Sequence, residues 1–419
     1  MIQVAHFLEA DVAPWASIIC ERLFPATPEA LTHVLDNWRL VQNLPEDVLL
    51  SILRASSYPL ERMLAHAPFA CHALTCRSAF ELHGALRGLT VSASTLSACK
   101  EALLSLDDLE SLRLTGFSLA SPWQSAALCP YLSGLSNLQA LDLSGNSIGD
   151  TAAAALAHGV SSLTSLTELR LTDNYLTAVG AVALAPALAP LSHLRVLHLA
   201  GNLLQQDGAL ALAPSLEKLS RLELLDVGGA RLACAGAALI ACKLHNSITE
   251  LRLNLNLLTP SGIDPLGHCL RQLPSLQRLS LYSNSLKCQG VAALAPHLAH
   301  LTSLLSLNLS SNNVGSDGVV TLASILPQLQ RLQVLDISQN CVKDTGVRAL
   351  AAELPACARM TELRLEDNHV TEVGATLLCS CAVQMPALVV LDLRDNHISS
   401  FRPSHADGVR ADLLASILV

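Results

Sequence analysis

The residues best suited by type to do chemistry are two cysteines and two histidines in the first quarter of the chain. Cys71, His72, Cys76 and His83 can all bind a metal ion. Their spacing matches no common zinc site, however. We therefore expect a buried helix with two small thiols in this segment, and no metal site.

Motifs of the common enzyme classes are absent from the sequence. It has no G-x-x-x-x-G-K-S/T loop to bind phosphates and no G-x-S-x-G turn to present a nucleophilic serine. The fifteen histidines are scattered, as at His193, His297 and His300, and form no cluster along the chain. We therefore predict a protein that is not an enzyme and has no catalytic residue, metal site or cofactor.

Charge and hydropathy limit the classes of partner. The net charge is −9 without any acidic run, which disfavours nucleic acid as a partner. The mean hydropathy is +0.42, but apolar stretches such as residues 181–191 contain prolines, so we expect no membrane span. The first residues lack the basic region of a signal peptide.

The thirteen cysteines bear on the cellular compartment. Their number is odd and their spacings show no paired framework. Several fall on expected helices, where small buried thiols are common: Cys242, Cys269, Cys357 and Cys379. The sequence therefore predicts a reduced, cytoplasmic protein.

Eleven copies of the pattern L-x-x-L-x-L-x-x-N-x-L fill the last three quarters of the chain. They begin at Leu109, Leu138, Leu166, Leu194, Leu222, Ile248, Leu276, Leu304, Leu332, Met360 and Leu388. Successive copies are 28 residues apart, except for a first step of 29 and a step of 26 into Ile248. Such regularity predicts a solenoid in which each unit buries its apolar face against its neighbours.

Each copy predicts a strand, a turn and a helix. Residues 168–172 alternate apolar and polar, as in a strand with its leucines inward. Asn174 and its counterparts follow the strand, where the amide can bond to the backbone of the turn. An Ala- and Leu-rich helix then returns the chain to the next strand. Right-handed crossovers of this kind predict an α/β horseshoe, with parallel strands on the concave face and helices on the convex face.

The repeats also predict how the chain is divided. We expect a small helical N-terminal domain at 1–85, a capping repeat at 86–108 and eleven repeats at 109–408. Residues 409–419 are apolar enough to form a C-terminal capping helix.

One column of residues, between the second and third leucines of each copy, should line the concave face. Its members of interest are Arg113, Asp142, Arg170, His198, Asp226, Arg252, Asp336, Arg364 and Asp392. Neighbouring strands lie about 4.8 Å apart, so adjacent members can touch. The column is either a self-paired charge ladder that keeps the sheet soluble or a docking strip for a polar partner. The alternating signs favour the ladder.

The 28-residue length and the helix after each Asn resemble leucine-rich repeats of the ribonuclease-inhibitor type. The resemblance covers residues 86–419 and implies a scaffold that binds other proteins. Axonemal proteins of the nexin–dynein regulatory complex have a similar layout, which implies a structural subunit of a flagellar or cytoskeletal assembly. The Ran GTPase-activating proteins share the repeat type, and Arg170 or Arg252 would then act on a GTPase. This chain lacks their acidic tail.

A segment at about 44–83 resembles an F-box. The resemblance starts at Leu44-Pro45-Glu46-Asp47 and continues through Leu49, Ile52 and Leu53, although the usual Trp after Cys76-Arg77 is missing. It implies a ubiquitin-ligase receptor that binds a Skp-type adaptor through Leu44, Pro45, Leu49, Ile52 and Leu53. The alternative is a helical cap or dimerisation domain in which these side chains fill the core.

Overall fold

The computed structural model describes residues 88–92, 109–115, 128–129, 132–399 and 417–418. It divides into two compact units, Met1–Asn174 and Tyr175–Val419. The expected helical domain at 1–85, with its F-box-like segment and residues Leu44, Pro45, Leu49, Ile52 and Leu53, lies outside the described residues. Its assignment therefore stays a prediction.

The described part of the first unit is a ladder of parallel strands with a helix between the last two. The strands are β1 (Gly88–Ser92), β2 (Ser111–Thr115), β3 (Ala140–Asp142) and β4 (Glu168–Arg170), and the helix is α11 (Gly149–Ser161). Each strand pairs with the next, with Leu112 opposite Leu141 and Leu141 opposite Leu169. Strand β1 falls within the expected capping repeat and extends the ladder by one strand.

The second unit continues the same pattern with nine strands, each pairing in parallel with the next. The strands are β5 (Val196–His198), β6 (Leu224–Asp226), β7 (Glu250–Arg252), β8 (Arg278–Ser280), β9 (Ser306–Asn308), β10 (Val334–Asp336), β11 (Glu362–Arg364), β12 (Val390–Asp392) and β13 (Ile417–Leu418).

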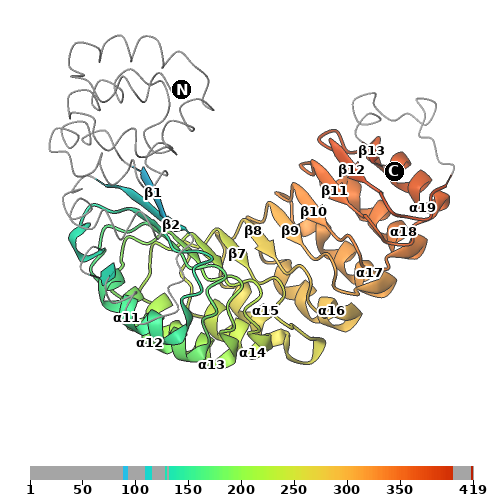
Figure 1. Ribbon diagram of the computed structural model, residues 1–419. Helices are drawn as coiled ribbons and strands as arrows, with labels where there is room; N and C mark the ends of the chain where they lie inside the picture. The colour runs from blue at the N-terminus through green and yellow to red at the C-terminus, as the bar shows by residue number, and fades with distance from the viewer. Residues whose placement is uncertain (1–87, 93–108, 116–127, 130–131, 400–416, 419) are drawn as a thin grey trace, which may run out of the picture. The chain divides into compact units, whose positions relative to one another are not determined.

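Helices follow the strands of this unit and lie side by side along one side of the ladder (Figure 1). The α-helices are α12 (Ala178–Leu188), α13 (Gln205–Leu216), α14 (Ala233–Ala241), α15 (Asp264–Leu270), α16 (Lys287–Leu298), α17 (Gly315–Ile325), α18 (Lys343–Glu353) and α19 (Glu372–Ala382). Short 3-10 turns are η3 (Pro260–Gly262), η4 (Leu326–Gln328) and η5 (Leu354–Ala356). The predicted α/β repeat solenoid is confirmed. None of the helices among the described residues is long and apolar enough to cross a bilayer.

The core is the layer of leucines between strands and helices. The alternation predicted for residues 168–172 is present, since Leu169 and Leu171 are buried while Arg170 is exposed. On the helices, residues such as Leu184 and Leu188 of α12 face the strands. Apolar residues recur at every second position on the strands and at every third or fourth position on the helices. They therefore form one continuous apolar layer inside each unit.

The turn asparagines form a second ladder, as the sequence predicted. Asn312 is buried, and its Nδ2 donates to the backbone oxygens of Leu281, Leu309 and Ser310 at 2.9, 2.9 and 3.0 Å. Its backbone N–H donates to Oδ1 of Asn340 at 2.9 Å. The carbonyls that a three-residue strand leaves without partners are satisfied in this way, within and between repeats.

Of the expected capping helix at 409–419, only two residues are described, and these two are not helical. Residues Ile417 and Leu418 form strand β13, which pairs in parallel with Leu391 and Asp392 of β12. The physical reason is that the open edge of β12 offers unpaired backbone groups, which an extended segment satisfies and a helix does not. Residues 400–416 and 419 lie outside the described residues.

The sequence showed no paired framework of cysteines, but one pair does form a disulfide in the structure. Cys242 and Cys269 form a disulfide with Cα atoms 4.8 Å apart, which joins the end of α14 to α15. Their separation of 27 residues is about one repeat, so stacking brings them together although no local spacing marks them as partners. Cys357 and Cys379 are buried free thiols as expected, and burial raises the pKa of Cys357 to about 11.

Candidate functional site

The predicted column of polar residues stands at the third residue of its strands, on the side of the ladder away from the buried leucines. In the first unit Arg113 pairs in register with Asp142, and Asp142 with Arg170. The second unit brings together two further groups of the predicted residues: His198, Asp226 and Arg252, and Asp336, Arg364 and Asp392. We call this surface the strand face.

In the first unit the strand face holds paired charges. Nε of Arg113 lies 3.1 Å from Oδ2 of Asp142 on the next strand. Arg170 bonds instead to Glu168, two residues earlier on its own strand. Each of the two arginines is therefore held by a carboxylate, and such exposed pairs contribute little to stability.

The middle of the second unit is organised around Asp226. Its Oδ2 lies 3.4 Å from Nδ1 of His198 and 3.4 Å from Nη1 of Arg252. Burial by itself would raise the pKa of Asp226, but the hydrogen bonds from His198 and the Gly228 N–H, together with the charge of Arg252, lower it. Nε of Arg252 also donates to Glu250 at 2.7 Å. This part of the column is a self-paired ladder, as the alternating signs predicted.

Strands β10 to β12 differ, because the strand face there is hollowed. The hollow has a volume of about 420 Å³. Its lining residues include four carboxylates, Asp336, Glu362, Glu366 and Asp392, and two arginines, Arg364 and Arg394. Two positive and four negative charges give this hollow a net charge of −2. Tyr282, which is 39% exposed, and Val390 add apolar surface to its wall.

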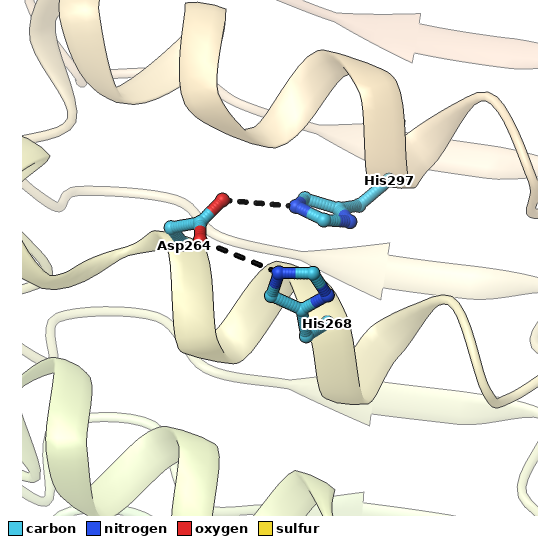
Figure 2. Close-up of side chains that lie close together, drawn as sticks. All are labelled: Asp264, His268 and His297. Carbon is cyan, nitrogen blue, oxygen red and sulfur yellow. Dashed lines mark hydrogen bonds and ion pairs between the residues drawn. The ribbon is translucent and has the colours of Figure 1, made fainter.

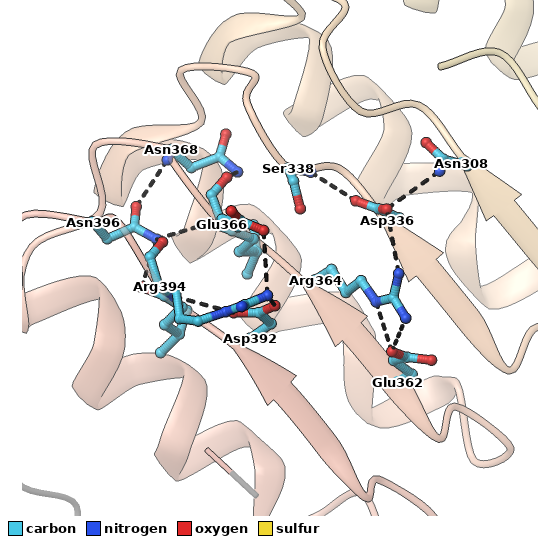
Figure 3. Close-up of polar contacts among 12 residues, drawn as sticks. Asn308, Asp336, Ser338, Glu362, Arg364, Glu366, Asn368, Asp392, Arg394 and Asn396 are labelled. Atoms are coloured by element: carbon cyan, nitrogen blue, oxygen red, sulfur yellow. Dashed lines mark hydrogen bonds and ion pairs between the residues drawn. The ribbon is translucent and has the colours of Figure 1, made fainter. Parts of the chain in front are cut away.

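The two arginines of the hollow are fixed by its carboxylates (Figure 3). Nε of Arg364 donates to Glu362 at 2.6 Å, and its Nη1 lies 3.9 Å from Asp336. Arg394 binds both oxygens of Asp392, with Nη2 to Oδ2 at 2.6 Å and Nε to Oδ1 at 2.9 Å.

Arg394 also reaches Glu366, since its Nη2 lies 3.4 Å from Oε2 of that residue. These fork-shaped contacts hold the side chains in place before any partner arrives.

Sequence reasoning missed Arg394 as part of this site. It stands two residues beyond Asp392, in the turn after β12, and so lies outside the column that the repeat defines. The signal was the local D-x-R sequence at 392–394, because the backbone N–H and the guanidinium of Arg394 both bond to Asp392.

Sequence reasoning also missed a second cluster, on the helices. It expected scattered histidines, yet the ligand atoms of Asp264, His268 and His297 lie within 4.8 Å of one another. These residues come from α15 and α16. Asp264 and His268 are four residues apart on α15, and the stacking of the next repeat brings His297 to them.

Comparison with known proteins bears on the repeats. A family model for leucine-rich repeats matches residues 134–157, 162–185, 191–213, 300–323 and 328–351. A solved leucine-rich-repeat protein of Leptospira interrogans is 20% identical, covers 77% of this chain and 88% of its own, and has a TM-score of 0.44. An internalin of Listeria monocytogenes is 18% identical, covers 80% of this chain and 86% of its own, and has a TM-score of 0.39. No curated protein sequence matches.

The unmatched repeats between residues 213 and 300 have the same strand and helix, and Asn256 and Asn284 keep the turn asparagine, which Ala230 replaces in the repeat of β6. Repeats of this kind generally serve to bind other proteins through an extended surface. The chain therefore contains leucine-rich repeats in the matched segments.

Proposed function

We propose that this chain is a non-enzymatic interaction protein that binds a basic segment of a protein partner in the hollow of β10 to β12. The observation that carries the proposal is the charge of that hollow, in which four carboxylates meet two arginines. The 28-residue repeat with a helix after each Asn supports assignment to the ribonuclease-inhibitor type.

The contrast with the rest of the strand face supports this location. On β2 to β4 the two arginines of the column each pair with one carboxylate, Asp142 or Glu168. In the hollow, four carboxylates meet only two arginines, and the side chains of Glu362 and Glu366 keep 23% and 34% of their surface exposed. A Lys or Arg side chain of a partner can approach these two carboxylates from solvent.

A ubiquitin-ligase receptor remains the second candidate, supported by the F-box-like sequence at 44–53. A subunit of a larger cytoplasmic or axonemal assembly is the third, supported by the layout of the chain. Co-purification with a Skp-type adaptor favours the former, and co-sedimentation with a stable large complex favours the latter. The Cys242–Cys269 disulfide counts against a reduced cytoplasmic setting for both.

A Ran-type GTPase-activating role has less support. Such a role needs an arginine that can reach the phosphates of a bound GTPase. Arg170 is held by Glu168, and Arg252 is held by both Asp226 and Glu250. Stimulation of GTP hydrolysis that disappears in Arg170→Ala or Arg252→Ala would revive this role.

The chain offers a matched pair of variants for testing the hollow. Glu168-Leu169-Arg170 and Glu362-Leu363-Arg364 have the same sequence and the same Glu–Arg contact, but the latter lines the hollow. The probe is a labelled peptide of alternating Lys, Arg and Ser residues, followed by fluorescence polarisation at low salt.

We expect Glu362→Gln to weaken peptide binding about fivefold, which corresponds to roughly 1 kcal/mol. Glu168→Gln should leave binding unchanged. Equal losses in the two variants, or tighter binding of an acidic peptide of the same length, would rule out the hollow as the site.

A further inference from the structure

Three potential metal ligands meet on the helix side of the second unit (Figure 2). Nε2 of His297 lies 3.0 Å from Oδ1 of Asp264, and Nε2 of His268 lies 3.4 Å from Oδ2 of the same carboxylate. The two imidazole rings have centroids 4.5 Å apart. Among the described residues, this is the one group of three such side chains placed to share an ion.

Two of the three residues, His297 and Asp264, depart from the repeat at their positions, whereas His158 of α11 occupies the same position as His268. In other helices the position of His297 is occupied by other residue types: Ala187, Ser215, Cys269, Ile325, Glu353 and Cys381. In other helices the position of Asp264 is occupied by residues without a carboxylate: Val182, Leu210, Ala238, Ala292, Val320, Arg348 and Thr376. The repeat needs none of these three polar groups in order to stack.

A third departure makes room for the cluster. Gly267 stands where most other repeats have alanine, as at Ala185, Ala213, Ala241, Ala295, Ala323 and Ala351. A Cβ atom at Gly267 would lie 2.3 Å from Cδ2 of His297. The glycine therefore leaves the space in which the imidazole lies.

Burial and charge suit these groups to bind a cation. His297 is buried, with 7% of its surface exposed, and its Nε2 points at the carboxylate. Asp264 offers a carboxylate oxygen, and His268 and His297 offer imidazole nitrogens, which is a ligand set that zinc takes in proteins. The side chains of Asp264 and His268 are 61% and 59% exposed, so an ion can reach the site from solvent.

We propose that Asp264, His268 and His297 bind a divalent transition-metal ion of the zinc type, with water at the remaining position. Tetrahedral zinc holds its nitrogen and oxygen ligands at about 2.0–2.1 Å, which places ligand atoms roughly 3.3 Å apart. The two carboxylate–imidazole distances, 3.0 and 3.4 Å, lie on either side of that value. Small side-chain rotations bring both imidazoles onto one ion, which replaces the two contacts to the carboxylate.

The ion would fasten α15 to α16. With seven residues, α15 is the shortest α-helix among the described residues. Its other neighbour, α14, is already joined to it by the Cys242–Cys269 disulfide. The shortest helix would then be cross-linked on both sides, by a covalent bond and by a metal ion.

The test measures Zn²⁺ binding to the full chain without reductant, in competition with a chromophoric chelator. The variants are His268→Ala and Asp264→Asn, both at exposed side chains. The matched control is His300→Ala, an exposed histidine three residues beyond His297. Circular dichroism checks that every variant is folded.

We expect the wild type and His300→Ala to bind one more Zn²⁺ per chain than His268→Ala and Asp264→Asn, or to bind that ion at least tenfold more tightly. Zinc should also raise the Tm of the wild type and not of His268→Ala. Gly267→Ala should behave like the ligand variants, because its methyl group displaces His297. Identical zinc stoichiometry, affinity and Tm shift in wild type and His268→Ala would overturn the proposal.

Discussion

The strand-face hollow of β10 to β12 and the helix cluster of α15 and α16 arise from the same repeat in opposite ways. The hollow is built from residues at the repeated position, Asp336, Arg364 and Asp392, whose chemistry varies from strand to strand. The helix cluster includes Asp264 and His297, at positions where most other helices have apolar or small side chains. In a repeat protein, some positions vary from repeat to repeat, and others hold the same kind of residue in nearly every repeat. A varied position, or an unusual residue at a uniform position, marks a surface that stacking alone does not explain.

The largest expected effect on stability is at the ladder of turn asparagines, which is the regular part of the structure. Asn312→Leu removes the amide that three buried carbonyls share. Each carbonyl keeps a second donor: Asn284 Nδ2 for Leu281, Asn340 Nδ2 for Leu309 and the Ser283 N–H for Ser310. Because three hydrogen bonds of about 1 kcal/mol each are lost, we expect a loss of roughly 3 kcal/mol. Equilibrium unfolding in urea measures it. Asn396→Leu, at a half-buried turn in the last repeat, is the control and should lose less.

The next largest effect is expected on the helix side, at the disulfide beside the cluster. Cys242→Ser with Cys269→Ser removes the bond that joins α14 to α15. A disulfide closing a loop of this size contributes about 2–4 kcal/mol, so the Tm should fall in the double variant.

Peptide mapping without reductant should recover Cys242 and Cys269 in one cross-linked fragment. Recovery of both as free thiols would restore the reduced state that the sequence predicted.

A smaller effect is expected in the hollow, from Asp392. This carboxylate is 3% exposed, and Arg394 binds both of its oxygens. Burial by itself would raise its pKa, but the hydrogen bonds and charge of Arg394 and the charge of Arg364 lower it. Asp392→Asn weakens a charge-assisted pair and should cost about 2 kcal/mol at pH 7.

The same group predicts a pH dependence. A carboxylate whose folded pKa is lowered contributes stability above its unfolded pKa, near 3.9, and loses it as pH falls through the folded value. Asp226, whose pKa is also lowered, acts in the same direction. The free energy of unfolding of the wild type should therefore decline below about pH 4. The decline should be shallower in Asp392→Asn, and equal slopes would show that Asp392 is not held by Arg394.

The smallest effect on stability is expected at Glu362. Its side chain is 23% exposed and pairs with Arg364. Because half-exposed pairs contribute at most about 1 kcal/mol, Glu362→Gln should scarcely change the urea midpoint. A large loss there would mean that the pair serves the fold and not a partner.

Sequence reasoning succeeded where the repeat itself decides the outcome. The leucine spacing predicted the buried layer, and the column rule placed Asp226 beside Arg252 and Asp336 beside Arg364. The turn asparagines were predicted because the short strands leave carbonyls that only a side-chain amide at that position can reach. These features depend on local periodicity, which one sequence shows directly.

It failed where contacts between neighbouring repeats depend on single residues. Cys242 with Cys269, and Asp264 with His297, are about one repeat apart, and only the stacking of the helices brings each pair together. The strand at Ile417–Leu418 was missed because an apolar segment satisfies either a helix or an open strand edge, and the edge of β12 decides between them. The visible signals for the helix cluster were Gly267 in place of the usual alanine and the spacing of four residues between Asp264 and His268.

The most direct test of the interaction surface is hydrogen–deuterium exchange of the full chain with and without the Lys- and Arg-containing peptide, at a saturating peptide concentration. We expect slower exchange in residues 334–341 and 362–369 and around Arg394, with no change in residues 205–216 of α13. Slower exchange confined to the helices, or equally strong at β2 to β4, would contradict a binding site in the hollow.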